Sequence, residues 1–420
     1  MSVQPTASLT VLALGPAPDV NTVLRLLGEV EMGCWFDRRA TGGVSLVMVE
    51  PDAVVRGASA LWPVLAAPAC ASNPGPFGFS GGWAGWISYE GAQQAIGLGD
   101  GELTVGHFPA VLAIDHARGT AYAVGRGPAG EAGAQAWAHR LRRLRSGAVG
   151  VVPGPRVTDP GPGLQDFVRQ VGVVQDWISA GQTYVANLTY RIRLEGLGDP
   201  PAAYRRLSAA HPAPLAALCH DSDHWILSSS PELLLRRHGQ TVWTRPIKGT
   251  RPAGQGGPLA ADPKERAELT MIVDMARNDL GQVARTSSVR VPELFAVEGH
   301  PGLEHLVATV AAEVSGSCGQ LLAAMLPGAS VTGAPKRRTV QLLRTLETNH
   351  RGVYTGTMGW CDNGGDLEWN VAIRTLEVIP GECRYGTGGG ITADSDPERE
   401  YQETRLKAAG PLAALGVAWR

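Results

Sequence analysis

The chain has 420 residues, of which 44% are hydrophobic and 18% are charged, and its formal net charge is −2. This length exceeds that of a usual single domain and predicts either two domains or one large composite core. The near-neutral charge gives no electrostatic footprint for nucleic acid or an acidic membrane, so composition favours an enzyme that acts on a small molecule.

The six cysteines are scattered without a Cys-x-x-Cys pair, which argues against both a zinc site and a disulfide scaffold. No stretch approaches about 18 uninterrupted apolar residues, and no basic segment followed by an apolar core opens the sequence. We therefore expect a cytoplasmic protein with no membrane and no nucleic-acid partner.

Three regions are expected along the chain. Residues 1–146 contain strand-like runs and one helical pattern, and we expect them to form an N-terminal region that belongs to the same composite core as the rest. Residues 147–163 are rich in proline and glycine, which predicts a linker. Residues 164–420 are expected to form the catalytic domain, with a helix over residues 167–178 and a strand over residues 184–194. Helices and strands recur without a repeat, which is typical of an α+β enzyme.

The segment of residues 245–252, Arg-Pro-Ile-Lys-Gly-Thr-Arg-Pro, presents a single lysine, Lys248. Pro246 and Gly249 predict a turn in which the glycine lets a ligand approach the backbone. A lysine amine is a nucleophile only when it is neutral, so a catalytic role requires a pocket that lowers its pKa. A solvated loop lysine is the alternative interpretation of this segment by itself.

Two expected helices start in the same way, with an aspartate N-cap followed by proline, at Asp262 and at Asp396. Glu268 lies in the first of these helices, and Glu400 and Glu403 share one face of the second. A solvated helix face would explain such residues, but three carboxylates from two helices also suit magnesium, which prefers oxygen ligands.

The run of Gly388, Gly389 and Gly390 precedes the second helix and predicts a nest of backbone N–H groups for a substrate carboxylate. Arg374 lies in the strand expected over residues 371–376, and an arginine among apolar neighbours indicates an anionic partner, either in the substrate or in a structural ion pair. His305 has no cysteine or serine elbow nearby, so it is either a structural histidine or a substrate contact.

Two further segments imitate known motifs without their spacing. Residues 328–336 resemble a phosphate loop, but two residues separate its glycine from its lysine, so an ATPase is excluded. Residues 316–319 lack the spacing of a nucleophile elbow, and no glutaminase domain surrounds them.

Taken together, these segments resemble the chorismate-utilising enzymes, the family of anthranilate synthase component I, aminodeoxychorismate synthase component I and isochorismate synthase. The resemblance covers about residues 164–415 and rests on motifs that are weak singly but stand in the family's order. These motifs are residues 229–232, 246–252, 266–279, 305–307, 332–336, 373–375, 388–391 and 393–404. The resemblance implies an α+β fold of two packed β-sheets enclosed by helices, of the anthranilate synthase component I type.

The resemblance also implies roles for individual residues. Glu268, Glu400 and Glu403 would bind Mg²⁺ against the ring carboxylate of chorismate, and Glu232 would be the acid that helps to expel the C4 hydroxyl. His305 is implied as a further catalytic residue that lines the substrate. Residues implied to bind the substrate are Thr250, Thr332, Lys336, Tyr354, Arg374, Gly388, Gly389 and Gly390.

Within the family, enzymes that aminate chorismate at C2 resemble PIAGT, whereas those that aminate at C4 resemble PIKGT, the form with Lys248. The lysine can attack C2 as the C4 hydroxyl leaves, after which ammonia enters at C4 and displaces it. The resemblance thus favours the aminodeoxychorismate synthase branch, which makes 4-amino-4-deoxychorismate for para-aminobenzoate and folate. Its partners would be chorismate, ammonia and a separate glutamine amidotransferase subunit.

The alternative within the family is the anthranilate synthase component I of tryptophan biosynthesis. A catalytically silent subunit would require loss of Lys248 and the carboxylates, all of which are present. Val185 stands where water-using members resemble one another in a general-base lysine, and valine cannot activate water. Val185 and Ala308 also depart from the glutamine and serine that are common in the aminating members.

Overall fold

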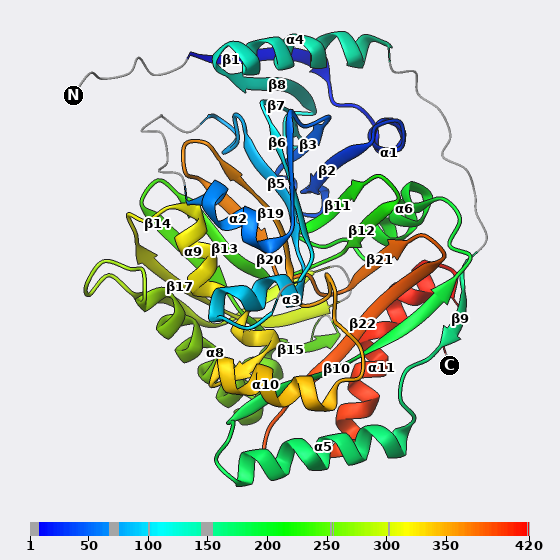
Figure 1. The fold of residues 1–420 in the computed structure, drawn as a ribbon, viewed down its shortest axis with the longest axis vertical. Coiled ribbons are helices and arrows are strands. Elements are labelled where there is room, and N and C mark those ends of the chain that lie inside the picture. Colours follow the sequence, from blue (N-terminus) through cyan, green and yellow to red (C-terminus); the bar gives the residue numbers. More distant parts are fainter. Residues whose placement is uncertain are drawn as a thin grey trace.

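The structure is a computed structural model that describes residues 8–66, 75–99, 101–143, 154–252, 254, 256–300, 303–417 and 419. Two large antiparallel β-sheets, A and B, dominate this part of the chain, and helices cover their outer faces (Figure 1). The α+β architecture of two packed sheets that the resemblance implied is therefore confirmed.

Sheet A has twelve strands in the part of the chain that is described. In spatial order they are β1 (Leu9–Pro16), β8 (Thr120–Arg126), β7 (Ala110–Asp115), β3 (Val44–Val49), β2 (Met32–Asp37), β11 (Ala216–Asp221), β12 (His224–Ser228), β21 (Thr375–Ile379), β22 (Glu382–Ile391), β10 (Val185–Glu195) and β18 (Gly333–Ala334), with β9 (Arg156–Asp159) also paired to β10.

Sheet B has ten strands over the same described residues. In spatial order they are β15 (Ile247–Pro252), β17 (Leu303–Glu313), β14 (Thr241–Arg245), β13 (Leu233–His238), β20 (Leu367–Asn370), β19 (Thr357–Asp362), β5 (Gly82–Ile87), β6 (Leu103–Phe108) and β4 (Ala53–Arg56), with β16 (Arg290–His300) also paired to β17.

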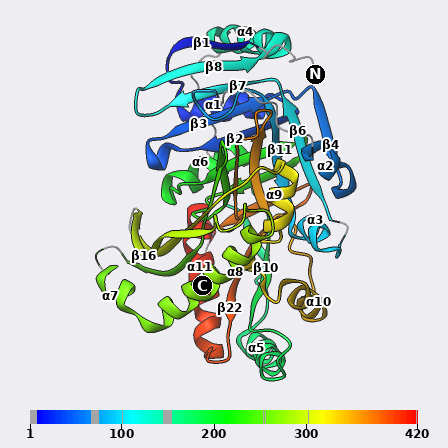
Figure 2. The same ribbon diagram turned by 90° about the vertical axis from the view of Figure 1, so that its left-hand side faces the viewer.

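Helices surround the sheets. They are α1 (Val20–Gly28), α2 (Ala58–Leu65), α3 (Tyr89–Ala92), α4 (Gly127–Arg143), α5 (Leu164–Ser179), α6 (Pro200–Ala210), α7 (Gly256–Ala261), α8 (Pro263–Gly281), α9 (Cys318–Met325), α10 (Lys336–Leu346) and α11 (Pro397–Ala414). Helix α4 covers β1 and β8 at one end of the molecule, and α5 lies at the opposite end in both views (Figures 1 and 2). None of the described helices is long and apolar enough to cross a membrane.

The two sheets share a core of large apolar side chains. Cys34, Phe36 and Met48 from sheet A are buried in one cluster with Trp86 and Trp360 from sheet B. Three further clusters lie beneath the helices, one under α1, α6 and α11, one under α8 and α9, and one under α5. Burial of this apolar surface is the main force that holds the sheets together.

Strands from the first 143 residues form a continuous block at one end of each sheet and join the later strands there. In sheet A, β2 pairs with β11, and in sheet B, β5 pairs with β19. The expected division at residues 147–163 stays a prediction, because residues 144–153 lie outside the described part of the chain. Strand β9 occupies part of that segment and extends sheet A at β10.

The two aspartate–proline starts are confirmed as helix N-termini. The carboxylate of Asp262 accepts hydrogen bonds from the backbone N–H groups of Lys264 and Glu265 at the start of α8. Asp396 accepts one from Arg399 at the start of α11. Both caps satisfy backbone N–H donors that have no partner inside the helix. They also fix the direction of the glutamates in the first turn of each helix.

Candidate active site

Lys248 lies in strand β15, which pairs with β17, and not in the turn that Pro246 and Gly249 predict. The prediction fails because the ladder with β17 supplies partners for the backbone, while a bulge between Lys248 and Thr250 absorbs the glycine. Gly249 has a φ of 64°, and a Cβ there would lie 2.7 Å from Leu259 Cδ1 and 2.9 Å from a carboxylate oxygen of Glu265. The space beside this glycine is therefore taken by protein side chains and not by a ligand.

The glycine run also forms a strand, the last part of β22, which pairs with β10 through Gly388–Thr189, Gly389–Leu188 and Gly390–Asn187. None of the three glycines has a positive φ, so they do not form the expected nest, which needs alternating backbone handedness. The ladder with β10 holds them extended. The absence of side chains at these glycines leaves room on both faces of the sheet, since successive positions on a strand face opposite sides.

Lys248 and Glu400 use that space from opposite faces. A Cβ on Gly390 would lie 3.3 Å from Lys248 Nζ and 3.7 Å from Val185 Cγ2, and a Cβ on Gly389 would lie 3.3 Å from Glu400 Oε2. The amine and the carboxylate thus both reach the main chain of one strand. A Cβ at either position would require the end of the neighbouring side chain to shift by a few tenths of an ångström.

Ammonium groups link the glutamates that were expected to bind metal. Lys248 Nζ lies 3.5 Å from Glu268 Oε2, and Lys264 Nζ lies 3.8 Å from Glu268 Oε1 and 3.9 Å from Glu400 Oε1. Glu403 pairs with Lys407 at 2.8 Å. The structure therefore places Glu268 beside Lys248 and links Glu268 to Glu400 through Lys264. The charges of Lys407, Lys248 and Lys264 together lower the pKa of Glu403, so this carboxylate belongs to the same charged group.

Negative charge accumulates at these helix starts. Burial raises the pKa of Glu400, and the neighbouring charge of Glu403 raises it further against the hydrogen bond from Ser395. The pKa of Glu265 is raised in the same way, by burial and then by Glu268. Burial alone would lower the pKa of Lys264, but the surrounding glutamates raise it above its usual value. Such a group of carboxylates favours a cation.

The ligands of a metal ion are not yet assembled. Across the described residues, no three histidine, cysteine or carboxylate side chains stand close enough together to hold one. The donors are nevertheless all carboxylate oxygens, which fits a hard divalent cation such as Mg²⁺. Glu265, which was not among the three expected ligands, belongs to the same charged group.

Glu232 lies between β12 and β13 and is only 5% exposed. Burial raises its pKa to about 7, although a hydrogen bond from Ser330 and the positive charge of Lys248 both act in the other direction. Ser330 Oγ donates to Glu232 Oε1 at 2.6 Å. A carboxyl group with this pKa is partly protonated near neutral pH, as a general acid requires, and the charge of Lys248 lies within electrostatic range of it.

Several expected substrate-binding residues border the same strands. His305 is buried in β17 opposite Thr250, whose side chain lies outside the described part. The carbonyl oxygen of Thr332 accepts a hydrogen bond from Asn187 N at 2.9 Å. Tyr354 is buried against β22, where a Cβ on Gly386 would lie only 2.1 Å from its ring.

Lys336 has a different environment from the other expected contacts. Its Nζ donates to Asp279 Oδ2 at 3.0 Å and to the carbonyl oxygen of Met325 at 3.3 Å. The ammonium group therefore already has two protein partners. The structure does not bring it into contact with Lys248 or with the glutamates.

Arg374 lies between β20 and β21 and not inside a strand, so this prediction was wrong. Its φ is 51°, because the backbone on both sides serves other loops: Ser229 N donates to Arg374 O, and Val371 N donates to Glu232 O. Burial lowers the pKa of its guanidinium, and Tyr385 opposes that effect. No described carboxylate forms an ion pair with Arg374, which argues against the structural ion pair considered for it.

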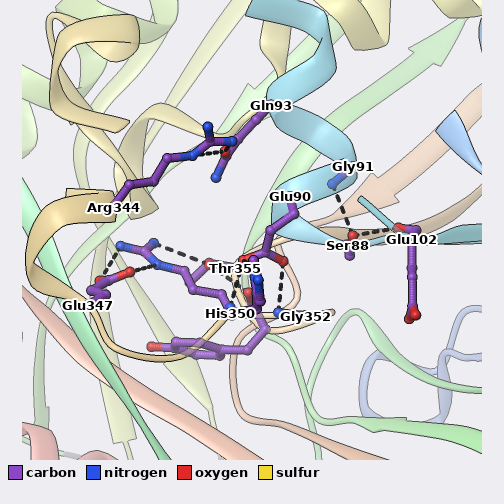
Figure 3. A network of polar contacts seen from close by, with 12 residues as sticks. Ser88, Glu90, Gly91, Gln93, Glu102, Arg344, Glu347, His350, Gly352 and Thr355 are labelled. Carbon is purple, nitrogen blue, oxygen red and sulfur yellow. Dashed lines mark hydrogen bonds and ion pairs between the residues drawn. The ribbon is translucent and has the colours of Figure 1, made fainter. Parts of the chain in front are cut away.

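A buried polar network at the edge of β10 was not anticipated. Its centre is Arg351, whose contacts join Glu347 and Thr355 beside the carboxylate of Glu90 (Figure 3). Ser330, the partner of Glu232, was missed as well, and it lies inside the segment set aside as a phosphate-loop mimic. No spacing signal could have found the Ser330–Glu232 pair, whose members are 98 positions apart, whereas Glu347 and Arg351 are only four positions apart.

Comparison with known proteins places these observations in a family context. The sequence profile described as chorismate binding enzyme matches residues 39–413. An aminodeoxychorismate synthase from Streptomyces pristinaespiralis is 38% identical over 389 residues, which are 84% of this chain and 53% of that protein. Aminodeoxychorismate synthase component 1 from Salmonella typhimurium is 42% identical over 241 residues, 55% of this chain and 53% of that protein.

Among solved structures, anthranilate synthase component I from Streptococcus pneumoniae is similar with a TM-score of 0.74 and 25% identity. The similarity covers 98% of this chain and 93% of that chain. The aligned part of the chain spans about half the length of the curated relatives described above.

Proposed function

The chain belongs to the family of chorismate binding enzymes, and from this premise we propose that it is the aminating component of an aminodeoxychorismate synthase. It would convert chorismate and ammonia to 4-amino-4-deoxychorismate, a precursor of para-aminobenzoate and folate. The observation that carries this choice is Lys248, whose amine lies against the glycine strand, 3.5 Å from Glu268 and within electrostatic range of the buried acid Glu232. The relatives named as aminodeoxychorismate synthases support the same choice.

The reaction then proceeds through side chains of this chain. Protonated Glu232 donates its proton to the C4 hydroxyl, which leaves as water, while the neutral amine of Lys248 attacks C2 and both ring double bonds shift. Ammonia next attacks C4, the double bonds shift back, and the bond between C2 and Lys248 breaks. The two displacements, the first at C2 and the second at C4, return the lysine unchanged and leave the amine at C4.

We include Mg²⁺ in this proposal, held by Glu268, Glu400 and Glu403. The oxygen donors and the mutual repulsion of the glutamates support it, and the ammonium groups of Lys264 and Lys407 are the counter-charges that the ion would replace. When bound, the ion would supply positive charge to the ring carboxylate of chorismate. Arg374, a buried arginine without a described carboxylate partner, is proposed to bind a carboxylate of the substrate as well.

Ammonia is proposed to come from a separate glutamine amidotransferase subunit, and the pathway to operate in the cytoplasm. The Salmonella relative is named as a component 1, which supports a second component. The cysteines within the described residues are buried thiols, and none lies in a glutaminase-like elbow. The chain by itself is therefore expected to use ammonia and not glutamine.

One assay tests the proposal. Purified protein is incubated with chorismate, Mg²⁺ and an ammonium salt, and the product is identified by chromatography and mass spectrometry. We expect 4-amino-4-deoxychorismate, with turnover that rises with pH as neutral ammonia forms until Glu232 loses its proton at a pH of about 7, and no product when glutamine replaces the ammonium salt. Formation of anthranilate would assign the chain to the C2-aminating branch, and glutamine-dependent turnover would contradict the separate subunit.

A further inference from the structure

Arg351 has an unusually complete set of contacts for a buried arginine. It is 2% exposed, and each of its five N–H donors has an acceptor. Its Nε and Nη2 bind the two carboxylate oxygens of Glu347 at 2.9 and 2.7 Å. Nη2 also donates to the carbonyl oxygen of Asn187 at 2.6 Å, and Nη1 donates to the carbonyl oxygen of Val331 at 2.8 Å and to Thr355 Oγ1 at 3.3 Å.

Glu347 extends these contacts along β10. Its Oε1 also accepts hydrogen bonds from the backbone N–H of Thr189 at 3.0 Å and from the Thr189 hydroxyl at 2.9 Å. The Arg351–Glu347 pair therefore occupies the edge of β10 between the short partner strands β18 and β9. In that gap side chains take the place of a neighbouring strand.

Every residue to which the side chains of the Arg351–Glu347 pair are hydrogen-bonded adjoins a residue of the proposed substrate pocket. Asn187 and Thr189 are the register partners of Gly390 and Gly388. Val331 directly precedes Thr332, and Thr355 directly follows Tyr354. Three separate segments of the pocket wall are thus joined to one ion pair.

The pair is itself anchored from behind. The carboxylate of Glu90 accepts hydrogen bonds from the backbone N–H groups of Arg351 and Gly352, at 2.7 and 2.9 Å (Figure 3). The guanidinium lies 4.1 Å from the centre of the Tyr89 ring, a cation–π contact in a buried setting. With no donor left over, the guanidinium cannot turn toward another partner.

We propose that Arg351 and Glu347 are positioning residues for the reaction: they set the spacing between the glycine strand, Thr332 and Tyr354, and so the fit of the pocket to the substrate. The inference rests on the proposed function for the identity of that substrate. Neither residue is assigned a contact with the reacting atoms. Their effect is exerted through β10, through the segment that ends at Val331, and through Thr355.

The experiment compares Arg351→Lys and Glu347→Gln with a matched buried pair elsewhere. The control is Arg38→Lys. Arg38 also forms a buried ion pair, with Glu368, and donates to a backbone carbonyl, that of Ala216, but none of these residues contacts Lys248. Each variant is measured for its melting temperature, for chorismate binding by calorimetry with Mg²⁺ and without ammonia, and for kcat and KM with ammonia.

We expect Arg351→Lys to raise both Kd and KM for chorismate about tenfold and to lower kcat/KM by about 10²-fold, because displacement of reacting groups by about 1 Å costs that much. A lysine keeps the charge but cannot span the five acceptors, so it should not restore the fit. Glu347→Gln, which keeps an acceptor for Thr189, should show a smaller change in the same direction. Arg38→Lys should lower the melting temperature without changing Kd.

Equal effects of Arg351→Lys and Arg38→Lys on Kd would overturn the proposal, since they would show a purely structural role. Should Arg351→Lys fail to fold, Thr355→Val removes a single contact of the pair and must still raise Kd; an unchanged Kd would overturn the proposal. A wild-type protein that does not bind chorismate would overturn the proposed function, and this inference with it.

Discussion

Two charged groups lie near the β10–β22 pair of sheet A, and they differ in how completely their charges are paired. In the group of Lys248, Glu268, Lys264 and Glu400, the nitrogen–oxygen distances are 3.5 to 3.9 Å. In the Arg351–Glu347 pair, they are 2.7 and 2.9 Å, and the side chains are 2% and 9% exposed.

The difference shows which charged side chains remain available to bind a ligand. A fully bonded pair has nothing left to offer a substrate and stabilises one geometry. Long ammonium–carboxylate contacts in a group with excess negative charge are weak, and a cation or a substrate can replace them at small cost. The first group thus has the properties of a reaction site, and the second has those of its support.

Removal of a carboxylate from the incompletely paired group should have the largest effect. We expect Glu268→Gln and Glu400→Gln to lower kcat by at least about 10³-fold, since loss of a metal ligand removes several kcal/mol of transition-state stabilisation. Rates are measured against Mg²⁺ concentration, and excess chelator should stop the wild type.

Glu398→Gln is the matched control, because Glu398 is exposed in the same first turn of α11. It should leave the rate unchanged. Full activity of the wild type in excess chelator would refute the metal assignment.

Lys248→Ala should come next in size. Formation of 4-amino-4-deoxychorismate should fall about 10³-fold, about 4 kcal/mol in barrier height, because the covalent adduct between the lysine and C2 can no longer form. Ammonia could then attack C2 directly, so we expect residual product of the anthranilate type. Lys248→Arg should not restore activity, because a guanidinium stays protonated.

Mass spectrometry checks the covalent step. Wild-type protein quenched with chorismate and no ammonia should carry an adduct on the peptide that contains Lys248. Wild-type rates of C4 amination by Lys248→Ala would show that the lysine only lines the pocket.

Glu232→Gln should lower kcat by about 10² to 10⁴-fold, the usual loss for a missing general acid, without moving the amine to C2. The active form of Glu232 is protonated and its pKa is about 7. In the pH–rate profile of the wild type, this acid therefore contributes a limb on which kcat falls as the pH rises through 7. The variant should lack that limb. Retention of the limb would assign it to another group.

The same residue gives a prediction on stability. Folding raises the pKa of Glu232 from 4.5 to about 7, so the charged form is disfavoured in the fold. The wild type should lose up to about 3 kcal/mol of unfolding free energy between pH 4.5 and pH 7, none below that window and no more above it. Glu232→Gln should not show this loss when urea unfolding is followed across the window.

The smallest effect is expected from Gly249→Ala, which changes the support beneath Lys248. A positive φ and the clash with Leu259 and Glu265 should reduce stability by about 1 to 3 kcal/mol. Gly239→Ala is the control, with a φ of 60° and no neighbouring atom within 4 Å of the added carbon. Equal losses in the two variants, measured by urea unfolding, would show that only backbone strain matters.

Local chemistry explains which features could be predicted from the sequence. The caps at Asp262 and Asp396 depend on residues next to one another in the chain, so they were predicted correctly, together with the helix faces that carry Glu268 and Glu400. The form of the segment at Lys248 depends on pairing with β17, which is distant in sequence, and propensity predicted a turn instead.

Features that depend on several distant segments were not predictable. Arg374 was assigned to a strand because its neighbours are apolar, but hydrogen bonds from the Glu232 loop hold that backbone out of the sheet. Only the spacing of Glu347 and Arg351, four positions apart, was available in the sequence, because the carbonyl acceptors of Arg351 come from β10 and from Val331. The architecture followed from ordered motifs, whereas the exact wall of the pocket required the assembled sheets.

The bare strand of Gly388, Gly389 and Gly390 restricts how this pocket could be redesigned. That wall has no side chain to exchange: a Cβ on Gly388 would lie 2.5 Å from the carbonyl oxygen of Leu188, and a Cβ on Gly390 would lie 3.3 Å from the amine of Lys248. A designer who wants a different product has side chains to exchange on the neighbouring strand. Val185 in β10 is one such position, since its Cγ2 would lie 3.7 Å from a Cβ on Gly390.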